Sequence, residues 1–294
     1  MRRCIAALAL ICATGGLWAA RAPIAAQPSG LVQILVDELS REYAALKAKG
    51  DPPPYYMAYA VTDEQTDSES ATLGALASDS HNHARGFDTT IRVGSEKFDN
   101  YHPFKGSRIQ FTKFTARSLD DDANQIRRAL WEESDRVYRL ASRRLLQLRT
   151  DNQLLADQAD KDADFSTEPA VQYTRLPESY PFNAERWADK VRAWSAEFKS
   201  HAKILGSGVS VRAQREIRTF VNTDGSRVQQ GRNLIRLQME GAAIAPDGMD
   251  VETFASIDAS DPAHLPADNV VRAKVREIAA KLDGLVAAPP AEPI

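Results

Sequence analysis

The chain has 294 residues, with 37 basic and 40 acidic side chains and a formal net charge of −3 at pH 7. This mildly acidic balance lacks the basic surface that nucleic-acid binding requires, so we expect no nucleic-acid partner. Both cysteines, Cys4 and Cys12, lie near the N-terminus. Removal of that terminus would leave no disulfide, no cysteine nucleophile and no thiolate ligand for a metal.

The N-terminus has the organisation of a secretory signal. Basic residues at Arg2-Arg3 precede an apolar run that extends to Ala20, and small residues at Ala25-Ala26 suit a signal peptidase. Gly15-Gly16 interrupts the run, which is then shorter than the roughly 20 apolar residues of a membrane span. We predict a signal peptide over residues 1–26 and a protein that is periplasmic or secreted. A buried N-terminal helix is the alternative.

The mature chain opens with a predicted helix. Leucines at three- and four-residue spacing begin after Ser29, and Gly50 with the following prolines ends the pattern. Three short strands, separated by polar turns, are expected next: Tyr55–Val61, Glu69–Ala77 and Arg85–Val93.

A long helix is predicted from Ser118, the expected N-cap, to Arg149, with Asp120, Asp121 and Asp122 in its first turn. Its apolar face comprises Leu119, Ala123, Ile126, Leu130, Val137, Leu140 and Leu148, widened by Trp131, Tyr138 and Leu145. Four arginines near its end could suggest a phosphate site, but a solvated face with acidic partners explains them better. These are Arg139, Arg143, Arg144 and Arg149.

The segment that follows is polar. Its aspartates lack the glycine turn and closing glutamate of a calcium loop, and we interpret them as solvated charges. They are Asp157, Asp160, Asp162 and Asp164. Asn183 then caps a helix with an aromatic stripe that is typical of a core: Trp187, Val191, Trp194 and Phe198.

The C-terminal third predicts a three-stranded meander over Val209–Asn222, Asn233–Ile244 and Met249–Ile257, with Met249, Val251, Ala255 and Ile257 on one face. Turns fall at Asp224-Gly225 and Asp247-Gly248. A last amphipathic helix carries Val271, Val275, Ile278, Leu282 and Leu285. The whole predicts an α+β fold, an antiparallel sheet with flanking helices, as one domain over 27–286. Residues 287–294 form a Pro/Ala linker.

No residues stand out as catalytic or metal-binding, and the substrate-binding residues are unknown from the sequence. His81 and His83 are the one close histidine pair, without an evident third ligand, so a polar loop is the better interpretation. The other histidines, His102, His201 and His264, are scattered. No G-x-S-x-G elbow occurs, and Gly206-Ser207-Gly208 lacks the lysine of a phosphate loop.

Five phrases, in this order, resemble the N-terminal domain of the TldD/PmbA metallopeptidase family (peptidase U62), and of its exported members in particular. The phrases are Pro53-Pro54-Tyr55-Tyr56, Arg92-Val93-Gly94-Ser95, Phe98-Asp99-Asn100, Phe220-Val221-Asn222-Thr223-Asp224-Gly225 and Ala245-Pro246-Asp247-Gly248-Met249. The resemblance covers roughly residues 29 to 294.

The resemblance implies a peptidase that degrades or processes peptides, with a C-terminal domain that binds zinc through an H-E-x-x-x-H motif. It also implies a dimer and a partner subunit. That motif is missing from this sequence, so we expect no cofactor in this chain and zinc in the absent domain. The chain would then be a truncated or split product.

Three functions remain open. The chain is the N-terminal domain of a zinc metallopeptidase, inactive alone, or an exported non-catalytic module that binds extended peptides or acts as a scaffold. The third alternative is an enzyme with an unrecognised site near His81 and His83.

Overall fold

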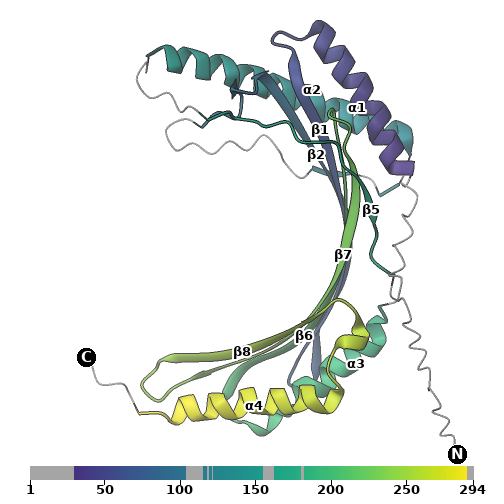
Figure 1. Cartoon of the computed structure of the whole chain (residues 1–294). Coiled ribbons are helices and arrows are strands. Elements are labelled where there is room, and N and C mark those ends of the chain that lie inside the picture. Colours follow the sequence, from purple (N-terminus) through teal and green to yellow (C-terminus); the bar gives the residue numbers. More distant parts are fainter. Residues whose placement is uncertain are drawn as a thin grey trace, which may run out of the picture.

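The computed structural model describes residues 30–103, 115–117, 119–120, 122–154, 162–179 and 182–289. Within these ranges eight strands form one arched sheet (Figure 1). Its order is β3-β2-β1-β6-β7-β5, with β4 paired to β2 and β8 paired to β7. The long strands are β1 (Pro54–Thr72), β2 (Ala75–Ser95), β6 (Ile204–Asn222), β7 (Arg227–Ile244) and β8 (Asp250–Ala259).

Four α-helices and several short elements complete the described fold. The helices are α1 (Gly30–Lys49), α2 (Ala123–Leu154), α3 (Ala184–Ser195) and α4 (Asp268–Ala287). The short elements are β3 (Phe98–Asp99), β4 (Thr115–Arg117), β5 (Gln172–Arg175), and the 3-10 turns η1 (Ala196–Ser200) and η2 (Pro262–His264). All strand pairs are antiparallel except β5 with β7. The predicted α+β class is confirmed, and so is the meander, as β6-β7-β8. None of the described helices is long and apolar enough to span a membrane.

The prediction of three short strands after α1 is wrong. The structure has two long strands, β1 and β2, joined by a tight turn at Leu73-Gly74, where both residues have positive φ. The polar stretches taken for turns are paired strand residues, with Gln65 opposite His83. A run of polar residues in the sequence suggested turns, whereas in the structure these residues form the middle of two strands, between the two cores.

The sheet has two hydrophobic cores, both on the same face. The upper core packs α1 and α2 against β1 and β2, and the lower core packs α3 and α4 against β6, β7 and β8. Met57, Tyr59 and Val61 of β1 enter the upper core, whereas Ala71 enters the lower one. These positions are all odd-numbered, and β1 pairs with β6 without a register break from Ala58 to Ala71. Because alternate strand residues face opposite sides, the helices all lie on one face, the outer side of the arch in Figure 1.

The helices confirm most predicted faces but correct several positions. α2 begins at Ala123, and Asp122 is its cap, since its carboxylate accepts hydrogen bonds from the backbone N–H groups of Asn124 and Gln125 at 2.8 and 2.9 Å. Ser118, the expected cap, and Asp121 lie outside the described residues. The helix starts later because an aspartate at Ncap can satisfy two free N–H groups there.

Some apolar residues predicted to be buried are exposed. Leu119 lies before α2 and is exposed, and Trp131 is exposed on the side of α2 that faces solvent. In α4, Leu285 is exposed, and Val286 is buried in its place. Met249 belongs to the turn before β8 and is 57% exposed. By contrast, Asn183 caps α3 as predicted, accepting a hydrogen bond from Arg186 N at 2.8 Å, and the aromatic stripe is buried.

We predict that Leu237→Ala lowers the free energy of unfolding by about 2–5 kcal/mol, because Leu237 is fully buried in the lower core. The matched control is Leu205→Ala, since Leu205 is 68% exposed and its truncation should change stability by no more than about 0.5 kcal/mol. Urea unfolding followed by circular dichroism measures both. Equal losses in the two variants would contradict the assigned core.

Candidate functional site

The histidine pair lies on a strand, so the interpretation as a polar loop is wrong. His81 and His83 both project from β2, two residues apart. The His81 ring pairs with Asp67, and His83 Nε2 lies 2.7 Å from Asp63 Oδ1. Each ring therefore contacts its own carboxylate on β1, and the two do not converge on one point.

The described residues offer no metal centre. Among them, no group of three or more His, Cys, Asp or Glu side chains could hold a metal ion. This part of the chain does not fit the zinc that the resemblance implies, because a protein zinc site needs at least three converging ligands. That the whole chain holds no metal stays a prediction.

The structure brings four of the five sequence phrases together at one corner of the sheet, which we call the Asp99 corner. Asp99 is fully buried and accepts hydrogen bonds from Tyr55 Oη at 2.6 Å, Arg92 Nη1 at 2.5 Å and the backbone N–H of Tyr101 at 2.6 Å. Asn222, which opens the hairpin turn, donates to Tyr56 Oη at 3.4 Å. Four of the phrases, although far apart in the sequence, thus belong to one packing site in the fold.

Asn100 fixes the same corner from the neighbouring position. Its side-chain oxygen accepts from Val93 N at 2.8 Å, and its amide donates to Ile91 O at 3.1 Å. Gly94 has a φ of +112°, and a Cβ there would lie 2.6 Å from the carbonyl oxygen of Phe98. Only glycine suits that close approach, so the phrase around Gly94 is required by the backbone.

Asp164 corrects the interpretation of its segment as solvated charges. Its carboxylate is buried and accepts from Asp99 N at 2.8 Å, and His102 Nδ1 lies 2.8 Å away. The next residue, Phe165, packs against Tyr56 at 4.7 Å between ring centroids and lies under the Arg92 guanidinium. Asp157 and Asp160 lie outside the described residues. No periodic pattern in the sequence predicts this contact, because a loop with no regular structure supplies it.

The chemistry available at the Asp99 corner is structural. Burial raises the pKa of Tyr55, and the hydrogen bond to the Asp99 carboxylate raises it further, so the phenol stays protonated and donates. The Asp99 carboxylate is satisfied by Tyr55, Arg92 and the backbone N–H of Tyr101. We therefore assign this corner to holding β1, β2 and the loop at Asp164 together, and not to catalysis.

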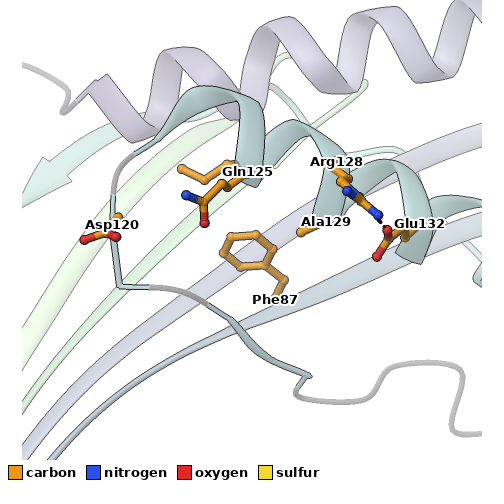
Figure 2. Close-up of a pocket in the computed structure, with 7 residues that line it drawn as sticks. Phe87, Asp120, Gln125, Arg128, Ala129 and Glu132 are labelled. Carbon is orange, nitrogen blue, oxygen red and sulfur yellow. Dashed lines mark hydrogen bonds and ion pairs between the residues drawn. The ribbon is translucent and has the colours of Figure 1, made fainter.

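A cavity of about 280 Å³ lies at the start of α2. Figure 2 shows residues that line it. The Phe87 ring lies on one side, and Gln125 points toward the space above it (Figure 2). Arg128 Nε donates to Glu132 Oε1 at 3.0 Å, so these two charges engage each other. Apart from this ion pair, the cavity offers an apolar wall, the Gln125 amide and the Asp120 side chain, and we assign it no reaction.

The sheet face away from the helices, here called the open face, is polar in its middle and apolar at its lower end. Glu64 pairs with Arg212 at 3.7 Å and Glu216 with Arg232 at 3.5 Å. At the lower end a hollow of about 570 Å³ is lined by residues of β6, β7 and β8. Three large apolar side chains of these strands are exposed, and we call them together the apolar patch: Leu205, Ile244 and Phe254, which are 68%, 50% and 72% exposed. Phe254 also lines the hollow.

Solved structures share this fold. A protein described as a candidate modulator of a DNA gyrase, from Thermotoga maritima, matches with a TM-score of 0.51 and 11% identity over 87% of this chain and 50% of that chain. TldE from Thermococcus kodakarensis matches with a TM-score of 0.51 and 14% identity over 85% of this chain and 47% of that one. No protein-family model and no curated protein matches the sequence.

These matches define the class by fold. The chain has an α+β fold that resembles part of TldD/TldE structures, and it spans about half the length of the solved structures that it matches. The family resemblance in the sequence is thus supported at the level of the fold, while the activity is a separate question.

We predict that Asp99→Asn lowers the free energy of unfolding by about 3–5 kcal/mol, since it leaves the Arg92 guanidinium without its buried counter-charge. Asp247→Asn is the control, because Asp247 is exposed and an asparagine can still accept from Met249 N. Thermal and urea unfolding at pH 7 measure both. A loss at Asp99 no larger than that at Asp247 would show that the corner does not stabilise the fold.

Proposed function

We propose that this chain is the non-catalytic N-terminal half of a TldD/PmbA-like zinc metallopeptidase, inactive in peptide hydrolysis until it meets a zinc-bearing half. The observation that carries the proposal is the fold match, which takes in 87% of this chain but only 50% of the matched one. The hydrolytic step needs a metal-activated water, and we assign that step to the other half.

The open face supports a role as one wall of a peptide cleft. Its middle presents side chains already paired in ion pairs, such as Glu64 with Arg212, so an extended peptide could lie over it without leaving charges unpaired. The apolar patch, with Phe254 72% exposed, suits contact with a second protein segment. We propose that the zinc-bearing half or a partner subunit covers this patch.

An exported module that binds extended peptides without cleaving them is the second candidate. One observation favours it: β8 pairs with β7 alone among the strands that the structure describes. The outer edge of Asp250–Ala259 could therefore receive an added peptide strand through main-chain hydrogen bonds. The charges at Asp250, Glu252 and Asp258 oppose uncontrolled pairing of this edge.

The purified chain should cleave no unstructured peptide alone, and cleavage that a chelator abolishes should arise when it is mixed with or fused to a cognate zinc-bearing segment. Fluorogenic peptide assays with and without chelator measure this. Chelator-sensitive cleavage by the chain alone would overturn the proposal. Binding of peptides without any gain on mixing would favour the second candidate.

A pair of variants locates the contact between the halves. Phe254→Ser should weaken the activity of the mixture by removing the largest exposed side chain of the apolar patch. Leu146→Ser, at a position that is 67% exposed on α2, is the matched control and should leave that activity unchanged. The same activity in both variants would exclude the apolar patch as the contact.

We also propose that the protein is exported, on the basis of the N-terminal signal pattern. The mature protein from its native host should begin at Gln27, because small residues precede that position. N-terminal mass spectrometry tests this. Soluble cytoplasmic protein with Met1 intact would contradict it.

A further inference from the structure

A polar cavity of about 430 Å³ lies on the helix-bearing face of the sheet. Its floor is formed by side chains of β1, β2 and β6, and Ser179, Phe182 and Ala184, before and at the start of α3, border it. Gln65, Asp67 and Glu69 of β1 line it from positions that follow Val61 of the upper core and precede Ala71 of the lower core. The sheet thus leaves a hollow where neither helix pair covers it.

One end of the cavity holds an acidic pair. Glu69 and Asp79 lie opposite each other in the register of β1 and β2. Glu69 is 1% exposed, and its Oε2 atom has no hydrogen-bond partner among the described residues. Burial, and then the neighbouring Asp79 charge, raise the pKa of Glu69 to about 7. Glu69 thus brings to the lining of the cavity a buried carboxylate oxygen without a donor, and such an oxygen is a strong hydrogen-bond acceptor.

The same cavity holds an unpaired donor. Arg215 of β6 lies opposite Gln65, and its Nε atom is buried without a hydrogen-bond partner among the described residues. Asp67 does not supply this partner in the structure, since its carboxylate pairs with the His81 ring. Two ionisable side chains that line the cavity, Glu69 and Arg215, therefore hold a buried acceptor and a buried donor without partners among the described residues.

The remaining wall is apolar. Phe182, Ala184 and Ala213 line the cavity beside the polar groups. A ligand that satisfies every part of this lining carries a cationic donor for the acidic pair, an anionic acceptor for the guanidinium, and a small aliphatic portion for the apolar wall. An α-amino acid with an aliphatic side chain has these three parts.

We propose that this cavity is a binding site for a free aliphatic α-amino acid, with the ligand ammonium on Glu69 and Asp79 and its carboxylate on Arg215. The site lies on the opposite side of the sheet from the open face and involves none of the residues assigned to the peptide cleft. It therefore goes beyond the proposed function and does not depend on it.

The charges around Glu69 set the pH dependence. Asp79 and Asp67 raise its pKa, and Arg192 of α3 lowers it; Arg215 and His81 line the same cavity. An ammonium group bound beside Glu69 favours its charged form. Binding near pH 7 should then release a proton, and affinity should rise as pH increases from 6 to 8.

Calorimetric titration of the full chain with L-leucine tests the site, with 3-methylbutylamine and 4-methylpentanoate as probes that each lack one charged group. Leucine should bind, and each probe should bind at least about tenfold more weakly. Glu69→Gln and Arg215→Gln should each weaken leucine binding by at least about tenfold, whereas Glu64→Gln, on the open face, should not.

Folding of the key variant can be judged separately. Because the Glu69 pKa is raised from its usual 4.5 in the folded state, wild-type stability should fall as pH rises from about 4.5 to 7. In Glu69→Gln this pH-dependent decrease in stability should be absent, and the variant should remain folded at pH 8.

No leucine binding at about 10 mM would overturn the proposal. So would equal affinity for the amine alone, or binding that is unchanged in both cavity variants.

Discussion

The structure depends on the pairing of β1 with its two neighbours, which keeps one register with β2 from Tyr56 to Ser70 and with β6 from Ala58 to Ala71. Gln65, at the middle of β1, lies opposite His83 in β2 and Arg215 in β6. This stretch has no helix packed over it in either hydrophobic core. Backbone hydrogen bonds and cross-strand polar pairs therefore hold the two cores in one sheet, and each core stabilises the strands from its own end.

This arrangement explains how the fold leaves surfaces free for function. Because both helix pairs pack on one face, neither core covers the open face. Among the described residues, only its upper end is covered, where Phe165 and Tyr101 pack against Arg92. The Asp99 corner secures one end of the sheet through buried hydrogen bonds, while the apolar patch lies at the other end. A rigid wall with one exposed apolar end is suited to enclosing a substrate against a second segment, which agrees with the proposed half-peptidase role.

Periodic signals predicted the parts of the fold that pack in regular elements. The apolar spacing of α1, the aromatic stripe of α3 and the alternation in β7 each report a buried face, and each face is buried. The sequence predicts strands shorter than β1 and β2, because the middle residues of these strands, such as Asp63, Asp67 and His81, do not alternate with apolar residues. Composition could not distinguish a polar strand from a polar loop there, since the pairing partners are distant in the sequence.

The candidate sites were harder to predict for the same reason. Asp99 and Asp164 meet across 65 residues of sequence, and the pKa of Glu69 is raised because the fold buries this residue beside Asp79. No local pattern encodes such a meeting. The five sequence phrases that resemble the family did indicate one of these sites. Four of the phrases contain residues that converge at the Asp99 corner: Tyr55, Arg92, Asp99 and Asn222.

Native-state hydrogen exchange of the backbone amides in the middle of β1 and β2 tests the central claim most directly. A continuous sheet predicts that amides of residues 62–68 and 78–84 are protected to a degree comparable with those of the flanking segments in the cores. Rapid exchange confined to these two stretches, with protection only at the ends, would mean that they are loops and that the two cores are not joined by one sheet.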